Sequence, residues 1–173
     1  MRVAAPSEFD TLYDIDLDSS ALFERAGLHM DFPDDHEFAL AERHRWTEAL
    51  SAGTTLLAVD TQGDPIGFAA VGAIDGEPYL AQLSVRVRCM QRGVGSALVE
   101  AAARMISEFG APALWLTTYA HLPWNRPFYQ RRGFDLVPDD QCGAGMTRQL
   151  FLERRWLPRP EERVAMRRTM GAR

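Results

Sequence analysis

Apolar side chains recur with the period of an α-helix over residues 94–109. They stand three and four positions apart, which is typical of a helix that packs one face on a core. The members of this stripe are Val94, Ala97, Leu98, Ala101, Ala102, Met105, Ile106 and Phe109. Gly110 can take the left-handed conformation that closes a helix, and Pro112 cannot continue one. The pattern therefore predicts a helix that ends at this point.

The residues before this helix alternate between apolar and polar positions. Over residues 79–87 an apolar side chain occupies every second position, which predicts a β-strand. A turn that contains Arg92, Gly93 and Gly95 joins the predicted strand to the predicted helix. Exposed backbone N–H groups and the positive end of the helix dipole meet at such a turn, and the glycines let a phosphate come close. The sequence therefore predicts an anion site here.

Other periodic segments predict a mixed sheet with helices around it. Strands are expected at residues 1–5, 54–59, 66–74, 113–118 and 163–170, and helices at 38–49, at 146–156 and after a cap at Ser7. Turn residues at 61–64 and 75–76 predict tight connections between strands. Hairpins come first and a strand–helix–strand crossover follows. We therefore expect a single domain over residues 1–173, with an α/β (α+β) fold and a mixed, largely antiparallel central sheet flanked by helices.

The strand, turn and helix over residues 83–98 resemble the acetyl-CoA-binding motif of the GCN5-related N-acetyltransferases, the GNAT family. That motif has an apolar strand, then Arg/Gln-x-x-Gly-x-Gly/Ala, then a helix. Counted back from Gly93 and Gly95, the Arg/Gln position is Met90, which departs from the family. Counted from Arg92, the run Arg-Gly-Val-Gly-Ser-Ala fits in a shifted register. Backbone amides do most of the phosphate binding at such a turn, so the departure weakens the match without breaking it.

A second motif follows at the spacing that the family uses. Tyr129 stands four residues before the pair Gly133-Phe134. The resemblance implies that Tyr129 lies near the sulfur of CoA and acts as the general acid, on a helix that covers the pantetheine arm. It also implies a cofactor contact at Asn125, although the Asn of the family lies farther ahead of the Tyr. The alternative for Tyr129 is a half-buried aromatic side chain that only packs. The two motifs together span residues 79–134.

The resemblance implies a GNAT-like fold, which agrees with the predicted order of elements, and acetyl-CoA as the cosubstrate. Strand residues would pair with the pantetheine through their backbone, and the turn would hold the pyrophosphate. The implied cofactor-binding residues are Leu83, Ser84, Val85, Gln91, Arg92, Gly93, Val94, Gly95 and Ser96.

The sequence leaves the general base open. Many members of the family have a Glu where this chain has Gln82. An amide cannot accept a proton, so Gln82 would act by orienting a water molecule. Strand parity places Leu80, Gln82 and Ser84 on one side, which we expect to face a cleft. His121 has a side chain whose pKa lies near neutral and is a second candidate, with an exposed loop histidine as the alternative interpretation.

Composition narrows the classes of function. The chain has 173 residues, of which 46% are hydrophobic and 25% charged, with a formal net charge of −5. A chain with this acidic balance lacks the basic face that nucleic acids need, so no nucleic-acid partner is expected. No apolar run reaches the ~20 residues of a membrane span, and the first residues do not resemble a secretory leader. We therefore expect a cytoplasmic protein without a membrane partner.

Metal-ligating residues do not fall into a convincing pattern. The two cysteines, Cys89 and Cys142, have no metal-ligand spacing and are expected to be reduced. His29 and His36 lie in an acidic loop whose carboxylates are Asp31, Asp34 and Asp35. Their spacing is not that of a helical metal site, so we expect no metal and expect the loop to border the amine site instead.

One leading hypothesis and two rivals follow. We expect an acetyl-CoA-dependent N-acetyltransferase that acts on a primary amine of a small molecule or a peptide. The absence of the usual Glu keeps open a non-catalytic acyl-CoA-binding regulatory domain. A nucleotide-binding domain is the second rival, and the lack of the GxxxxGK[ST] signature counts against it. The sequence identifies neither the amine nor the oligomeric state, for which a homodimer is one option.

Overall fold

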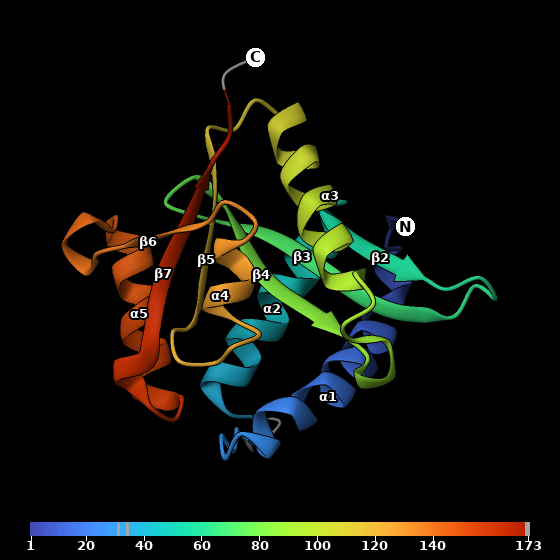
Figure 1. The fold of residues 1–173 in the computed structure, drawn as a ribbon, viewed down its shortest axis with the longest axis horizontal. Helices are drawn as coiled ribbons and strands as arrows, with labels where there is room; N and C mark the ends of the chain where they lie inside the picture. Colours follow the sequence, from blue (N-terminus) through green and yellow to red (C-terminus); the bar gives the residue numbers. More distant parts are fainter. Residues whose placement is uncertain (31, 34, 172–173) are drawn as a thin grey trace. The chain divides into compact units, whose positions relative to one another are not determined.

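The computed structural model describes residues 1–30, 32–33 and 35–171. Its seven strands form a sheet in the order β1-β2-β3-β4-β5-β7-β6 (Figure 1). The β4–β5 pair is parallel, with Tyr79 opposite Trp115, whereas the pairs β1–β2, β2–β3, β5–β7 and β6–β7 are antiparallel. This arrangement confirms the predicted mixed, largely antiparallel sheet with flanking helices.

Residue contacts divide the chain into two compact units. Unit 1 comprises residues 1–72 and 80–102, and unit 2 comprises residues 73–79 and 103–173. The prediction of a single domain is not decided by this division and stays a prediction.

Unit 1 contains the first strands of the sheet, the two helices that lie between β1 and β2 in the chain, and the start of the helix of the first motif. Its elements are β1 (Arg2–Val3), η1 (Pro6–Glu8), α1 (Phe9–Arg25), α2 (Glu37–Ser51), β2 (Thr55–Val59), most of β3 (Pro65–Ile74), the later part of β4 (Glu77–Val85), η2 (Val87–Cys89) and the first part of α3 (Val94–Glu108). These bounds confirm the expected strands and helices to within a few residues.

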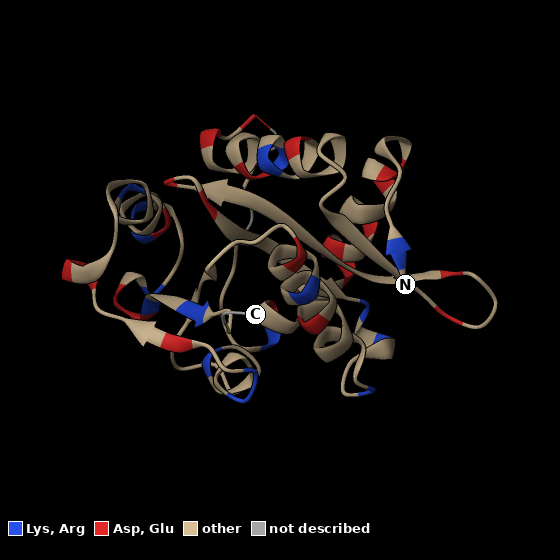
Figure 2. Cartoon of the chain, turned by 90° about the horizontal axis from the view of Figure 1, so that it is seen from above, with Lys and Arg blue, Asp and Glu red and all other residues tan. Residues whose placement is uncertain are grey.

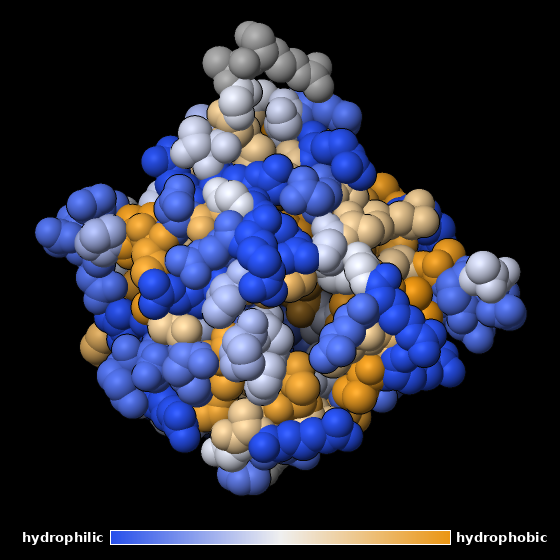
Figure 3. All heavy atoms as spheres, viewed as in Figure 1, coloured by the Kyte–Doolittle hydropathy of each residue, from blue (hydrophilic) through white to orange (hydrophobic). Residues whose placement is uncertain are grey.

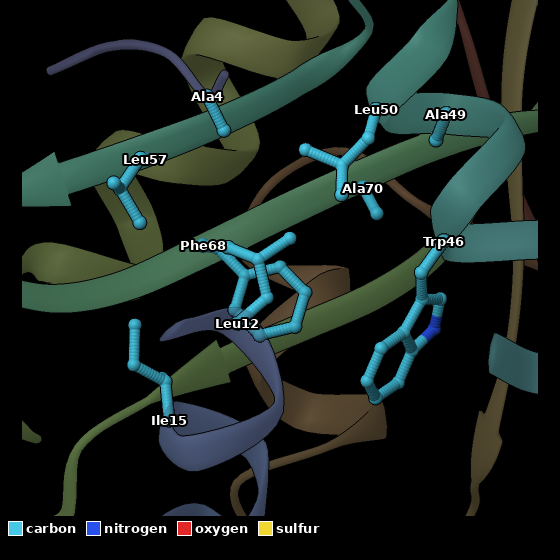
Figure 4. Packing of buried hydrophobic residues seen from close by; sticks show 9 residues of the cluster. All are labelled: Ala4, Leu12, Ile15, Trp46, Ala49, Leu50, Leu57, Phe68 and Ala70. Carbon is cyan, nitrogen blue, oxygen red and sulfur yellow. The ribbon is translucent and has the colours of Figure 1, made fainter. Parts of the chain in front are cut away.

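The core of unit 1 lies between the sheet and the first two helices. Leu12 and Ile15 of α1 and Trp46 of α2 pack with Phe68 of β3, and Figure 4 shows these side chains pointing toward one another. The rings of Trp46 and Phe68 meet edge to face, with their centroids 5.6 Å apart. Burial of such large apolar side chains supplies most of the driving force for folding. Helices α1 and α2 therefore cover one face of β2 and β3.

Helix α3 packs near the opposite face, because β3 carries a glycine there. A Cβ atom on Gly67 would lie 2.9 Å from the carbonyl oxygen of Ser84 and 3.3 Å from Cδ1 of Leu98. The absence of a side chain thus lets β3 approach both β4 and α3 closely. This packing fixes the start of α3 next to the end of β4.

Unit 2 contains the second motif and the C-terminal strand. Its elements are β5 (Ala113–Tyr119), α4 (Arg126–Gln130), β6 (Asp135–Val137), η3 (Asp139–Gln141), α5 (Ala144–Trp156), η4 (Pro160–Glu162) and β7 (Arg163–Thr169). Strand β7 lies between β5 and β6, as Figure 1 shows. The sequence predicted β5, α5 and β7, but it missed β6, which has three residues and therefore no readable alternation.

The predicted helix cap at Ser7 is wrong. Residues Pro6–Glu8 form one 3-10 turn, and α1 begins only at Phe9. At the start of this 3-10 turn, Oε2 of Glu8 accepts a hydrogen bond of 2.7 Å from the backbone N–H of Ala5. The side-chain hydrogen bond from Arg2, together with that backbone hydrogen bond, lowers the pKa of Glu8 to about 2. Serine is a common cap, but a proline just before it shifted the start of the helix.

Charged and apolar residues are mixed over the surface. Figure 2 shows acidic and basic positions interspersed along the helices and loops, and Figure 3 shows one face on which hydrophilic residues surround small apolar areas. Phe109, Phe151 and Leu17 are the most exposed large apolar side chains, at 71%, 63% and 62%. In the ranges that the structure describes, no helix is both long enough and apolar enough to cross a membrane.

Asp75 connects the β3–β4 turn to the start of α5, all within unit 2. Its backbone has a φ of 54°, and its Oδ1 accepts a hydrogen bond of 2.7 Å from the backbone N–H of Gly145. Its Oδ2 accepts one of 3.2 Å from the N–H of Met146. The carboxylate therefore satisfies N–H groups at the positive end of α5, although the sequence analysis predicted only a turn here.

Asp75→Asn is expected to lower the free energy of unfolding by about 1 kcal/mol, because the amide keeps the left-handed turn but loses the charge that faces the helix dipole. The measurement is the midpoint of urea unfolding. Asp64→Asn, in the β2–β3 hairpin, makes the same change away from α5 and should leave the midpoint unchanged. Equal midpoints for the wild type and Asp75→Asn would show that the cap does not contribute.

Candidate functional site

The segment before the turn of the first motif is anchored at two points in unit 1. The chain leaves the tip of β4, passes through η2 and enters α3 (Figure 1). Oδ2 of Asp18 in α1 accepts a hydrogen bond of 2.6 Å from the N–H of Val87, and Nε of Arg86 donates one of 3.0 Å to the carbonyl of Pro65. These contacts anchor the segment that leads into the turn.

The turn itself has the geometry of an anion site. Gln91 and Gly93 both have positive φ, at 59° and 85°, and both are exposed. Helix α3 begins directly afterwards at Val94, as predicted, and its first turn contains no acidic residue. A Cβ on Gly93 would meet no atom within 4 Å, so the space over this residue is open. Backbone N–H groups at the start of a 15-residue helix can therefore receive a phosphate here.

Three polar side chains, from β4 and α1 of unit 1, meet in one cluster. Oδ1 of Asp16 accepts a hydrogen bond of 2.6 Å from Nε2 of Gln82 and another of 2.6 Å from Oγ of Ser84. Nε2 of Gln82 also lies 3.0 Å from Oγ of Ser84. Burial raises the pKa of Asp16, and the hydrogen bonds from Ser84 and Gln82 oppose the shift only in part. We call these residues the Asp16 cluster.

The burial of Leu80 and Ser84 corrects the expectation that these two side chains face an open cleft, whereas Gln82 and Asp16 are half-buried. Ser84 is 2% exposed and Leu80 is 4% exposed, so both are buried. Gln82 is half-buried, and its amide nitrogen binds a carboxylate. Sequence reasoning missed Asp16 because its neighbours on α1 gave only an approximate apolar stripe, and nothing in the local pattern indicates a partner on β4.

Tyr129 lies at the end of α4 in unit 2, in a compact local motif. Gly133 has a φ of 77°, which closes the helix, and the N–H of Phe134 donates a hydrogen bond of 3.2 Å to the carbonyl of Tyr129. Phe134 is fully buried, and its ring centroid lies 5.7 Å from that of Tyr129. The spacing of Tyr, Gly and Phe thus has a physical cause: the glycine turns the chain so that the two rings pack.

The Tyr129 hydroxyl makes no hydrogen bond to the described residues. The Tyr129 ring packs edge to face on Phe128, with the two ring centroids 5.0 Å apart. Burial raises the pKa of Tyr129, and the positive charges of Arg163 and Arg132 oppose this shift only in part. The hydroxyl therefore stays protonated at neutral pH.

His121 and Asn125 flank the segment between β5 and α4. The His121 side chain is 21% exposed, and its Nδ1 lies 3.5 Å from Oε2 of Glu162. Both ring nitrogens are buried and lack a hydrogen-bond partner among the described residues, so the alternative of an exposed loop histidine is wrong. The carbonyl of Asn125 accepts a hydrogen bond of 3.0 Å from the N–H of Tyr129. The proposed roles of both residues stay predictions.

A buried ionic network supports unit 2, and the sequence analysis did not identify it. Oε2 of Glu153 accepts hydrogen bonds of 3.0 and 2.8 Å from Nε and Nη2 of Arg163. Oε1 of Glu153 accepts bonds of 2.6 Å from Thr117 and 2.7 Å from Gln149. Tyr79 and Thr117 share a further bond of 2.7 Å. Burial alone would lower the pKa of Arg163, and Glu153 outweighs this effect and raises it. The network joins β4, β5, α5 and β7.

The acidic loop contains no metal site that can be described. His36 accepts a hydrogen bond of 3.2 Å from the N–H of Phe38 and so caps α2, and its ring stacks on Phe32. Asp31 and Asp34 lie outside the described residues. Among the residues that are described, no group of three or more His, Cys, Asp and Glu side chains could hold a metal ion. Cys89 and Cys142 are free thiols.

Comparison with solved structures identifies the fold. An acetyltransferase of the GNAT family from Staphylococcus aureus Mu50 matches with a TM-score of 0.68 and 15% identity, over 95% of this chain and 94% of that one. The ribosomal-protein-alanine N-acetyltransferase of Brucella melitensis matches with a TM-score of 0.64 and 18% identity, over 98% of both chains. The PaiA N-acetyltransferase of Thermoplasma acidophilum, solved with coenzyme A, matches with a TM-score of 0.63 and 15% identity, over 98% of this chain and 97% of that one. These likenesses show a shared fold.

The family follows from the sequence match. The model of the acetyltransferase (GNAT) family matches residues 13–134, which include most of α1, the turn before α3, and Tyr129. This match covers more than half of the chain, including the glycine-rich turn before α3 and the motif of Tyr129, Gly133 and Phe134. The chain belongs to the GNAT family of acetyltransferases.

Proposed function

We propose that the protein transfers the acetyl group of acetyl-CoA to a primary amine of a small molecule or a peptide. The observation that carries the proposal is the turn before α3, where Gln91 and Gly93 have positive φ and the space over Gly93 is open. Membership of an acetyltransferase family supports the reaction class. Three solved relatives with this fold are acetyltransferases by name, and one of them contains coenzyme A.

The residue roles follow the chemistry of a thioester. Backbone N–H groups over residues 91–96 would hold the pyrophosphate, and the backbones of Leu83 and Val85 would pair with the pantetheine amides as an added strand would. Asn125 would contribute a further cofactor contact. Tyr129 would protonate the sulfur as the C–S bond breaks, which its protonated state at neutral pH permits. His121 is a candidate for the base that removes a proton from the amine.

A non-catalytic acyl-CoA-binding protein is the second candidate, because Gln82 stands where many members of the family have Glu. A thiol-release assay separates the two functions. The assay uses acetyl-CoA with spermidine, free amino acids, an aminoglycoside and a short peptide with a free N-terminus. Release above the rate of hydrolysis supports the transferase. Binding of acetyl-CoA, seen as a thermal shift, without release supports the regulatory protein.

Gly93→Val is expected to weaken acetyl-CoA binding at least about tenfold, because a branched side chain would cover the N–H groups of the turn and disfavours positive φ. The measurement is the dissociation constant of acetyl-CoA by calorimetry. Gly63→Val is the matched control: Gly63 also has a positive φ, of 93°, with no atom within 4 Å of a Cβ, but it lies in the β2–β3 hairpin. A folded Gly93→Val protein with wild-type affinity would contradict the phosphate site.

A further inference from the structure

We infer that Asp16 is the group that takes the proton from the amine, with Gln82 and Ser84 as the residues that position it. This inference rests on the proposed acetyl transfer. The sequence left the base open because Gln82 cannot accept a proton, yet the amide of Gln82 binds the carboxylate of Asp16 directly. Position 82 of β4 has no acidic side chain of its own, and Asp16 of α1 places a carboxylate next to it.

The geometry of the Asp16 cluster orients the carboxylate. Oδ1 accepts both hydrogen bonds, from Gln82 and from Ser84. Oδ2 accepts none from the described residues, so one oxygen is fixed and the other is left to bind a proton. A carboxylate fixed through one oxygen by two donors has a defined direction, which is what proton transfer requires.

The position of the cluster along β4 places it where the reacting end of the cosubstrate is expected. The turn that would hold the pyrophosphate follows the end of β4 at Val85. An arm that pairs with the backbones of Val85 and Leu83 runs back along β4, at about 3.3 Å per residue, and reaches residue 82 next. Gln82 and Ser84 flank Leu83 in sequence and project from the same face of β4, where both bind the Asp16 carboxylate.

The charges around Asp16 leave it able to bind a cation. On the elements packed against α1, Arg43 of α2 lies over the Tyr13 ring, Arg86 donates to Pro65, and Arg88 of η2 is exposed. Glu8 of η1 pairs with Arg2, Glu42 of α2 pairs with Arg45, and the other ionisable groups of α2 are exposed: Glu37, His44 and Glu48. On α1 itself, Asp14 is exposed and Asp18 binds the N–H of Val87. Burial raises the pKa of Asp16 above that of an ordinary Asp, which brings it nearer to the pKa that suits a base at neutral pH.

The proton balance of the step is complete with these residues. The ammonium gives one proton to Asp16, and the neutral nitrogen then attacks the thioester carbon. As the C–N bond forms and the C–S bond breaks, the electron pair of that bond leaves on sulfur, and the sulfur takes up the second proton that the nitrogen loses. Asp16 returns its proton to solvent, so one proton is released for each acetyl group transferred.

The test is the pH profile of kcat/KM for Asp16→Asn, with the amine of the panel above that the wild type acetylates fastest. At pH 7 we expect a fall of at least about tenfold and loss of the acidic limb, with the affinity for acetyl-CoA unchanged. Adding Gln82→Glu to Asp16→Asn should restore part of the rate, because it returns a carboxylate to the cluster. Asp14→Asn removes the same charge from an exposed position of α1 and should keep wild-type rates.

Ser84→Ala gives a second readout that does not need Asp16 to be replaced. The hydrogen bond from Ser84 lowers the pKa of Asp16, so its removal should move the acidic limb to higher pH. A wild-type profile in Asp16→Asn, or an acidic limb that disappears in His121→Ala instead, would overturn the inference while the transferase stands. Failure of the wild type to release thiol with any amine would reject the proposed function, and the inference with it.

Discussion

Glu153→Ala is expected to lower the free energy of unfolding by about 3–5 kcal/mol, the largest loss of stability that we predict. Glu153 and Arg163 are 3% and 8% exposed, so alanine would leave a guanidinium buried without its counter-charge. Gln149 and Thr117 would also lose the acceptor that they share. A loss of this size approaches the whole stability of an ordinary domain.

Urea unfolding of single and double variants measures the effect. Glu161→Ala removes an exposed carboxylate from the neighbouring turn and should change stability by less than about 0.5 kcal/mol. Combining Glu153→Leu with Arg163→Met should cost less than the sum of the two single changes, because the double variant leaves no buried charge unpaired. Additive costs, or a loss below about 1 kcal/mol for Glu153→Ala, would mean that the network does not contribute as an ion pair.

The local parts of the fold could be predicted because each element carries its own signal. The strand, turn and helix around Gly93 combine a period of two, a glycine-rich turn and a period of 3.6 within about thirty residues. The Tyr129, Gly133 and Phe134 motif is equally local: one glycine closes α4 and sets the two rings together. In both places the sequence and the structure agree because no distant residue is needed.

The contacts that sequence reasoning missed join residues far apart in the chain. Asp16 and Gln82 are separated by 66 positions, and Asp75 and Gly145 by 70. In each pair the two residues meet only in the folded structure, so neither helix periodicity nor turn chemistry indicates the contact. From the sequence, Asp75 was therefore interpreted only as a turn residue, and Gln82 only as a side chain that stands where many family members have Glu.

Tyr129→Phe separates chemistry from packing at the residue on which the proposed mechanism depends most. Phenylalanine keeps the ring that packs on Phe128 and Phe134, and removes a hydroxyl that has no hydrogen-bond partner among the described residues. Stability should therefore change little. If the hydroxyl protonates the sulfur, kcat should fall by roughly 10- to 1,000-fold while the affinity for acetyl-CoA stays the same. The lower end corresponds to a thiolate of pKa near ~8.5, which can leave with little help.

Tyr119→Phe is the matched control, because it deletes a hydroxyl in the same unit that has a structural partner. The Tyr119 hydroxyl donates a hydrogen bond of 2.8 Å to the carbonyl of Pro158. Its loss should reduce the free energy of unfolding by about 1 kcal/mol and leave kcat unchanged. The two variants should thus show opposite patterns: lost turnover with wild-type stability for Tyr129→Phe, and lost stability with wild-type turnover for Tyr119→Phe. A folded Tyr129→Phe enzyme with wild-type kcat would show that Tyr129 only packs, and that the thiolate leaves without an acid or takes its proton from another group.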